Sequence, residues 1–287
     1  MRQGEISVDG PSGAKNRRIA FTDWGAEDNT RIAICVHGLT RVGRDFDALA
    51  EALSDDYRVI CPDVAGRGKS DWLLSPEDYS YAQYMTDTHA LMAAIGATEI
   101  DWVGTSMGGF LGMMLAASKN SPIKRLVLND IGPFLPQSAL ARIGEYLAKG
   151  ETFVDVDAME AHLRLIHAPF GPLTNAQWHH MAEHSVRPAD GQGSKLAFHY
   201  DPTIAEAFSA VTGADIDVWE MWDKITCPVL TLRGEGSDVL PKETAEEMTT
   251  RGPKSKLVEF PNTGHASVLM AIEQTALVRD WLIFDAG

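Results

Sequence analysis

The sequence predicts an α/β protein whose mostly parallel sheet is covered by helices on both faces. Short apolar runs rich in β-branched residues alternate with longer segments of helical period. The runs are continuously apolar, which is typical of strands buried on both sides. This alternation stops once, from about residue 133 to 223, where only helical segments are predicted. A chain of 287 residues is long enough to bury a large core of this kind.

We predict eight strands, each a short apolar run bounded by polar, glycine or proline residues. They cover residues 6–9, 18–23, 31–36, 57–62, 99–104, 124–130, 228–233 and 256–260. Strand, helix and strand follow one another along most of the chain, which indicates a doubly wound sheet of about eight strands.

The helices are predicted from apolar residues that recur every three or four positions. The segment 81–95 shows one apolar stripe and connects two strands of the sheet. In the interruption, helical patterns cover residues 138–148, 157–166, 175–184 and 202–211. Because a structureless loop of this length is improbable, we expect a helical cap at 133–223, inserted after strand six. Residues 1–132 and 224–287 then form the core domain.

The charge balance argues against some classes of partner. Twenty-five basic and forty acidic side chains give a formal net charge of −15. Nucleic acids and anionic membranes both require clustered Lys and Arg, so we expect neither as a partner. No apolar run is long enough for a membrane span, and residues 1–18 lack the apolar region of a secretory signal. Three scattered cysteines in apolar segments suggest a reducing compartment, so we expect a cytoplasmic protein. The sequence does not determine the oligomeric state.

A Gly-Thr-Ser-Met-Gly motif at residues 104–108 carries the first catalytic signal. It lies directly after a predicted strand and before a glycine-rich apolar segment typical of a buried helix. In a nucleophile elbow, the glycines allow a turn tight enough to strain the serine backbone and expose its hydroxyl. A glycine-rich strand–helix turn without catalysis is the alternative. The position of the motif favours the elbow, and we predict Ser106 as the nucleophile.

A serine hydroxyl requires a base, and the base requires an orienting acid. His265 follows the last predicted strand, at the carboxyl edge where parallel sheets place their sites. Asp238 follows the penultimate strand and completes the chain order Ser, Asp, His. Glu235 on the same loop and Asp130 at the end of a neighbouring strand are the alternatives for the acid. We predict a triad of Ser106, Asp238 and His265.

An oxyanion hole is expected at the loop that follows strand 31–36. Gly38 allows the backbone to turn so that amides face the nucleophile, and the predicted donors are the N–H groups of Leu39 and Met107. His37 is expected to brace this loop and not to act as a second base.

The sequence predicts no metal and no organic cofactor. His180 and His184 have the i, i+4 spacing of some zinc sites. The intervening residues lack the glutamate placement of a zincin, and no third ligand is evident. Residues 63–70 lack the glycine spacing of a phosphate-binding loop.

Five motifs occur in an order typical of one superfamily. They are His37-Gly38, Asp63-x-x-Gly66-Arg67-Gly68-x-Ser70, Gly104-x-Ser106-Met107-Gly108-Gly109, Gly234-Glu235-x-x-Asp238 and Gly264-His265. Over nearly its whole length the chain resembles α/β-hydrolases with a helical cap, which implies the α/β-hydrolase fold. One departure is that many relatives place the acid three residues after the glycine of its loop, and here Asp238 is four after Gly234. A serine at 106 excludes the dehalogenases and epoxide hydrolases of the superfamily, which need a carboxylate nucleophile.

Within the superfamily, segments 199–202, 219–223 and 233–238 look similar to bacterial carboxylesterases, some of them active on aliphatic polyesters such as polylactide. The resemblance implies a carboxylic ester hydrolase that acts on a small-molecule or oligomeric ester. Enol-lactonases and carbon–carbon bond hydrolases also contain Ser-Met-Gly-Gly and are the alternative. A receptor that keeps the fold and hydrolyses little is a third hypothesis, against which the complete triad argues.

The cap is expected to form one lip of an apolar substrate pocket, because pockets favour the seam between two layers. Its aromatic residues Phe134, Phe170, Trp178 and Trp219 are the candidates for the lining, and the alternative for each is a place in the core of the cap.

Overall fold

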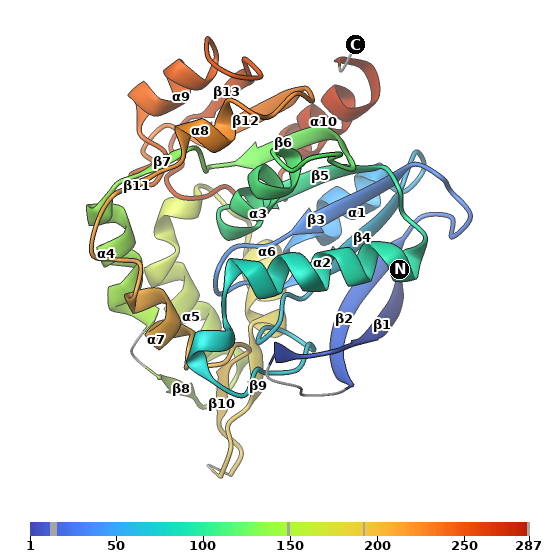
Figure 1. The fold of residues 1–287 in the computed structure, drawn as a ribbon. Helices are drawn as coiled ribbons and strands as arrows, with labels where there is room; N and C mark the ends of the chain where they lie inside the picture. The colour runs from blue at the N-terminus through green and yellow to red at the C-terminus, as the bar shows by residue number, and fades with distance from the viewer. Residues whose placement is uncertain (12–15, 148–149, 192, 286–287) are drawn as a thin grey trace.

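The computed structural model describes residues 1–11, 16–147, 150–191 and 193–285, and its centre is an eight-stranded sheet (Figure 1). The strand order is β1-β2-β4-β3-β5-β6-β12-β13. The strands are β1 Arg2–Val8, β2 Arg17–Trp24, β3 Ile32–Val36, β4 Arg58–Pro62, β5 Ile100–Thr105, β6 Ile123–Asn129, β12 Val229–Gly234 and β13 Lys256–Phe260. All eight predicted strands are therefore confirmed, and they form one sheet.

Most of this sheet is parallel, as predicted. The six strands from β4 to β13 in the sheet order pair in parallel. The two N-terminal strands depart from this pattern, because β1 pairs antiparallel with β2 and β2 pairs antiparallel with β4. The carboxyl ends of the parallel strands thus meet at one edge of the sheet, where a ligand site is expected.

Both faces of the sheet are buried, which explains the continuous apolar runs in the sequence. Ile34 packs into the core on one face, and its neighbour Cys35 packs into the core on the other. Leu128 and Val127 also pack on opposite faces of the sheet, since successive side chains of a strand point to opposite faces. One face is covered by α2 Tyr81–Ile95, α3 Met107–Ala116 and α9 Lys242–Met248, and the other by α1 Asp47–Leu53 and α10 Ile272–Asp280.

The boundaries of α2 match the predicted segment and are set by local signals. The Ser80 side chain accepts a hydrogen bond from the N–H of Gln83 and caps the first turn. Gly96 ends the helix with a φ of 72°, a left-handed conformation that glycine adopts without steric cost.

The residues between β6 and β12 fold mainly as helices that gather beside the sheet, with α4, α5 and α7 at the left of Figure 1. The helices are α4 Gln137–Leu147, α5 Val156–Ile166, α6 Asn175–His184, α7 Ile204–Ser209 and α8 Trp219–Trp222. The expectation of no strand in this segment was wrong. It contains β7 Phe134–Leu135, β8 Thr152–Phe153, β9 Val186–Pro188, β10 Leu196–Phe198 and β11 Ile216–Asp217. Strands of two or three residues are too short to show a period of two in sequence.

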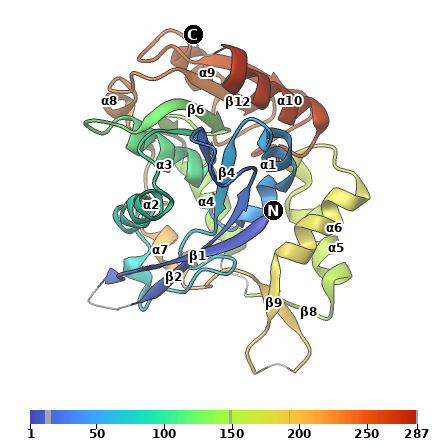
Figure 2. The same cartoon turned by 90° about the vertical axis from the view of Figure 1, so that its right-hand side faces the viewer.

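The cap has a small core of its own. Met159 and Leu163 of α5 pack against Trp178 and Met181 of α6, and all four side chains are buried. The three-stranded sheet of β8, β10 and β9 lies on the same side and projects at the bottom of Figure 2. Across the described residues, no helix combines the length and apolar character that crossing a membrane requires.

Candidate active site

Ser106 lies between β5 and α3 in a strained backbone conformation. Its φ is 51° and its ψ is −113°, and a positive φ is costly for a residue with a Cβ. The sharp turn from strand to helix is held by a hydrogen bond from the N–H of Ser106 to the carbonyl of Asn129 at the end of β6. The structure thus places Ser106 in the elbow that the sequence predicts.

The glycines of the motif are required by close backbone contacts. A Cβ on Gly104 would lie 2.3 Å from the carbonyl oxygen of Gly108, and a Cβ on Gly108 would lie 2.0 Å from that of Val36. Both distances are far below a van der Waals contact. The elbow therefore packs α3 directly against the ends of β3 and β5, which brings Ser106 to the carboxyl edge of the sheet.

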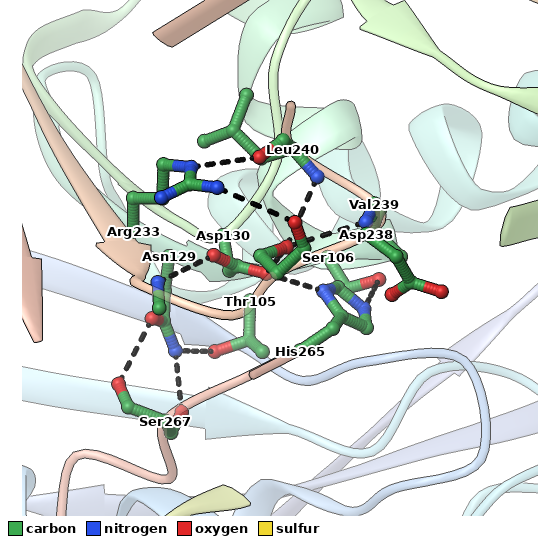
Figure 3. Close-up of polar contacts among 12 residues, drawn as sticks. Thr105, Ser106, Asn129, Asp130, Arg233, Asp238, Val239, Leu240, His265 and Ser267 are labelled. Carbon is green, nitrogen blue, oxygen red and sulfur yellow. Dashed lines mark hydrogen bonds and ion pairs between the residues drawn. The ribbon is translucent and has the colours of Figure 1, made fainter. Parts of the chain in front are cut away.

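His265 connects Ser106 to a buried carboxylate (Figure 3). Its Nε2 lies 2.9 Å from the Oγ of Ser106, and its Nδ1 lies 2.7 Å from the Oδ2 of Asp130. Because an ionised carboxylate can only accept, Nδ1 carries the proton and Nε2 is free to accept one from the serine hydroxyl. This is the arrangement that a general base requires.

Asp130 is held in place by several hydrogen bonds. Its side chain is fully buried, and its φ of 58° turns the chain at the end of β6. The N–H of Gly234 donates to Oδ1 at 2.8 Å, and the Ser237 hydroxyl donates to Oδ2 at 2.5 Å. With His265 as a further donor, the buried carboxylate has hydrogen bonds on both oxygens, which offsets the cost of removing it from water.

Asp238 does not contact His265, and the prediction that it is the acid of the triad was wrong. Its side chain is 46% exposed and makes a two-point ion pair with Arg142 at 2.6 and 2.8 Å. Glu235, the other candidate on this loop, is also exposed. The physical reason is that β6 and β12 are neighbours, so the loops after both strands reach the same imidazole. Asp130 fills that position, and the loop of Asp238 supplies donors to it.

Asn129 is a site residue that sequence reasoning missed. Its Nδ2 donates to the Oγ1 of Thr105 at 2.9 Å and to the carbonyl of Ser267 at 2.7 Å, and its Oδ1 accepts from the Ser267 hydroxyl. The side chain therefore links the end of β5, which carries Ser106, to the loop that carries His265 (Figure 3). The available signal was a polar residue at the end of a buried apolar strand.

The predicted oxyanion loop lies against the nucleophile. A Cβ on Gly38 would be 3.8 Å from the Cβ of Ser106, so the loop after β3 is in contact with the serine. His37 braces this loop as expected. Its Nδ1 donates to the carbonyl of Gly38 at 2.7 Å and its Nε2 accepts from the N–H of Val64 at 3.0 Å. Burial lowers the pKa of His37 to about 4, so the ring is neutral.

The two predicted amide donors flank Ser106. Met107 is the first residue of α3, so its N–H has no partner within the helix and lies at the positive end of the helix dipole. Leu39 lines the same cavity as Ser106. Their role as oxyanion donors stays a prediction.

Arg67, which sequence reasoning also missed, stands behind this loop. Its buried guanidinium donates to the Leu39 carbonyl at 2.8 Å and to the Tyr84 hydroxyl at 2.7 Å, and it lies 3.6 Å from the Sδ of Met107. One side chain thus contacts both residues predicted to supply the oxyanion amides. The signal was the Gly-Arg-Gly sequence at 66–68, whose arginine is enclosed between two turns.

A cavity of about 560 Å³ opens above Ser106 between the core and the cap. Its lining is mostly apolar. The core contributes residues that follow β3, β5, β6 and β13, among them Leu39, Ile131 and Val268, and the cap contributes Leu135, Leu140, Ile143, Tyr146, Phe170, Ile204 and Phe208. The cap therefore forms one wall of an apolar pocket over the serine.

Of the four aromatic residues predicted to line the pocket, only Phe170 does so; its ring stacks on His167 with 4.2 Å between centroids. Phe134 lies outside the lining because its neighbour Leu135 in β7 points inward instead. Trp178 belongs to the core of the cap. Trp219 lies under the guanidinium of Arg251, 4.5 Å from its ring centroid.

The cap is tied to the loop of the base near Phe170. The N–H of Gly264, the residue before His265, donates to the carbonyl of Pro169 at 2.5 Å. A Cβ on Gly264 would lie 2.9 Å from that of Pro169, so the two segments are in close contact.

The sequence shows no third ligand beside His180 and His184, but the structure places a carboxylate there. Asp47 of α1 lies near both, at 3.5 Å from the Nε2 of His180. Two of these groups, His180 and Asp47, already have protein partners, however. His180 Nε2 donates to the carbonyl of Arg44, and the Arg44 guanidinium holds the Asp47 carboxylate.

Comparison with known proteins agrees with this geometry. Residues 34–270 match the family model described as the alpha/beta hydrolase fold. The chain is 42% identical over 282 residues to a 3-hydroxybutyrate-oligomer hydrolase of Cupriavidus necator, covering 96% of both chains. It is 27% identical to a 2-(acetamidomethylene)succinate hydrolase of Mesorhizobium japonicum, covering 80% of this chain and 79% of that one.

Solved structures show the same fold. A putative hydrolase from Rickettsia typhi superposes with a TM-score of 0.92 at 33% identity, covering 98% of this chain and 99% of that one. An alpha/beta hydrolase from Novosphingobium aromaticivorans superposes with a TM-score of 0.85 at 35% identity, covering 96% of both. With the elbow serine, the parallel sheet and these matches together, the chain belongs to the α/β-hydrolase family.

Proposed function

We propose that this protein is a serine esterase that hydrolyses the ester bonds of short hydroxyalkanoate oligomers. The observation that carries the proposal is the continuous hydrogen-bonded line from Ser106 through His265 to Asp130, at the floor of an apolar cavity. The name and 42% identity of the oligomer hydrolase support the substrate class.

The geometry supports acyl transfer in two halves. Ser106 Oγ attacks the ester carbonyl as its proton passes to His265 Nε2, and Asp130 stabilises the imidazolium that forms. The amides of Leu39 and Met107 stabilise the oxyanion, each by a few kcal/mol in the transition state. The tetrahedral intermediate collapses, the ester C–O bond breaks, and the alcohol leaves with the proton from His265. Water, deprotonated by His265, then releases the acid and restores Ser106.

The cavity fits a substrate of this kind. A volume of about 560 Å³ is within the range of small-molecule sites, which suits a short oligomer. Apolar walls suit the methyl and methylene groups of such chains, while the ester group meets the polar atoms at the floor.

The test compares the wild type with Ser106→Ala on 3-hydroxybutyrate dimer and trimer and on p-nitrophenyl butyrate. We expect the variant to lose ester hydrolysis by about 10³-fold or more and to keep its circular dichroism spectrum and melting temperature. A phosphonate ester should add covalently to the wild type at Ser106 and not to the variant, as read by mass spectrometry. A folded Ser106→Ala protein with most of its activity would exclude this nucleophile. Turnover of lactones or dienoic ketoacids without any of simple esters would contradict the esterase assignment.

A further inference from the structure

Arg142 is a cap residue that faces the cavity. It lies on α4, one turn before Tyr146, and both side chains line the cavity above Ser106. Its side chain is 45% exposed, so it can reach a ligand that enters. Within the described residues, its one ion pair joins it to Asp238, on the loop after β12.

The ion pair uses only one edge of the Arg142 guanidinium. Nε and Nη2 donate to the two oxygens of Asp238. Guanidinium has five N–H groups, so the edge formed by Nη1 and the second proton of Nη2 remains. Within the described part of the chain, Nη1 of Arg142 has no hydrogen-bond acceptor. That edge has the geometry that binds a second carboxylate at two points.

Arg41, the other arginine of the lining, is not available in this way. Its Nε and Nη2 donate to Asp45, its Nη1 donates to the hydroxyl of Ser185, and its side chain is buried. The protein as a whole repels anions, with a net charge of −15. An anionic substrate therefore needs a local cation in the cavity, and of the two arginines in the described lining Arg142 is the exposed one.

We propose that Arg142 binds the free carboxylate end of the oligomer while an ester bond lies at Ser106, so that the enzyme acts at chain ends. The proposal rests on the proposed esterase function. A hydroxyalkanoate oligomer has one free carboxylate, at the alcohol side of its last ester bond. Anchoring this group places that ester over the serine and releases one hydroxyacid monomer at each turnover.

The first test compares the 3-hydroxybutyrate dimer with its methyl ester, which contains the same internal ester bond without the negative charge. Cleavage of the internal bond is followed by chromatography of the products. We expect Arg142→Gln to lower the ratio of kcat/KM for the free acid over that for the methyl ester by about tenfold or more. Arg142→Lys keeps the charge but loses the two-point hydrogen bonding. Its ratio should lie between those of the wild type and Arg142→Gln. A ratio that Arg142→Gln leaves unaltered would overturn the proposal.

Arg164→Gln is the matched control. Arg164 is a cap arginine of similar exposure, on α5, paired with Glu160 at 2.7 Å and outside the cavity lining. Its replacement removes the same charge from the cap, and we expect it to alter the substrate ratio by less than twofold. An equal fall of the ratio in Arg164→Gln would overturn the proposal, because the effect would then be one of net charge.

The Asp238→Asn variant distinguishes two roles for Arg142. In one, Arg142 binds the carboxylate of the substrate; in the other, its ion pair only links the cap to the core. If Arg142 binds the substrate, removal of the Asp238 charge, which repels a second carboxylate bound beside it, should raise the ratio of kcat/KM for the free acid over that for the methyl ester. If the ion pair only holds the cap, Asp238→Asn should impair both substrates as Arg142→Gln does. Equal losses in the two variants, on both dimers, would overturn the proposal.

A binding measurement without turnover tests the carboxylate site independently of the proposed esterase function. In the Ser106→Ala protein, calorimetry should show tighter binding of the free-acid dimer than of its methyl ester, and adding Arg142→Gln should remove the difference. If the wild type hydrolyses neither dimer and this difference is found, the esterase function fails and the carboxylate site stands. If hydrolysis proceeds and binding shows no dependence on Arg142, the carboxylate site fails alone.

Discussion

The Nδ1 of His265 lies 2.7 Å from the Oδ2 of Asp130, although Asp130 follows β6 and the loop after β12 offers two other acids. The Asp130 carboxylate is fully buried, and the amide of Gly234 and the hydroxyl of Ser237 hold it from the neighbouring loop. The acid and the loop expected to supply it thus form one hydrogen-bonded unit.

Asp130→Asn should lower turnover of p-nitrophenyl butyrate by about 10³-fold or more. An amide in place of the carboxylate can donate to Nδ1, which favours the wrong tautomer, and it cannot stabilise the imidazolium. Asparagine tolerates the positive φ of this position, so the fold should persist. Steady-state kinetics and circular dichroism check both points.

The paired control is Asp238→Asn, measured on the same uncharged ester. Its carboxylate is solvated and paired with Arg142, away from the base, and we expect a loss of less than about threefold. The reverse pattern, with Asp238→Asn crippling and Asp130→Asn mild, would refute the assignment of the acid.

Gly108→Ala should destabilise the protein by at least about 2 kcal/mol, because a Cβ would lie 2.0 Å from the Val36 carbonyl oxygen and the backbone must move. Activity should fall with it, since this contact positions the elbow. Gly213→Ala is the control, as nothing lies within 4 Å of its Cβ position, and its effect should stay within about 0.5 kcal/mol. Urea unfolding measures both, and equal stabilities of the two variants would contradict the steric argument.

Phe208→Ala should widen the cavity and shift the preference toward longer esters. We expect the ratio of kcat/KM for p-nitrophenyl octanoate over butyrate to rise by about fivefold or more, since each methylene in an apolar pocket is worth a kcal/mol or more. Trp219→Ala removes an aromatic ring of the cap that lies outside the lining, and its ratio should stay that of the wild type. Parallel shifts in both variants would show that the cap affects selectivity only through its folding.

The contribution of His37 to stability should fall as the pH is lowered from about 6.5 toward 4. Burial lowers the pKa of His37 to about 4 from an ordinary value of 6.5, so between these values the unfolded chain binds a proton that the folded one does not. The contribution of the neutral ring is therefore fully present above pH 6.5 and is lost on acidification. Urea midpoints at pH 7 and pH 5 test the trend. Ring resonances of His37 that titrate near 6.5 in the folded protein would contradict it.

The strands and the nucleophile could be predicted because their signals are local. Continuous apolar runs at positions such as Ile34, Cys35 and Leu128 reflect burial on both faces, and the glycines around Ser106 reflect contacts within the motif itself. His265 could be placed because it follows the last parallel strand, where the site edge of the sheet is fixed by topology.

The acid and most of the residues that line the pocket could not be predicted, because both depend on which distant segments meet. Spacing in sequence does not show that Asp130 adopts a φ of 58°, or that the loops after β6 and β12 converge. Apolar periodicity shows that the cap helices have a buried face without showing what covers it. Trp178 faces the core of the cap, whereas Phe170 faces the cavity.

The hydrogen bond from Gly264 to Pro169 joins the loop that carries the catalytic base to the cap that covers the cavity. A cap that moves outward to admit a substrate or release a product must first break this bond, and the residue preceding His265 then loses its anchor. The alignment of the base is therefore linked to the position of the cap through one backbone hydrogen bond. The exchange rate of the Gly264 amide hydrogen, followed by NMR in the native protein, reports how often this hydrogen bond opens.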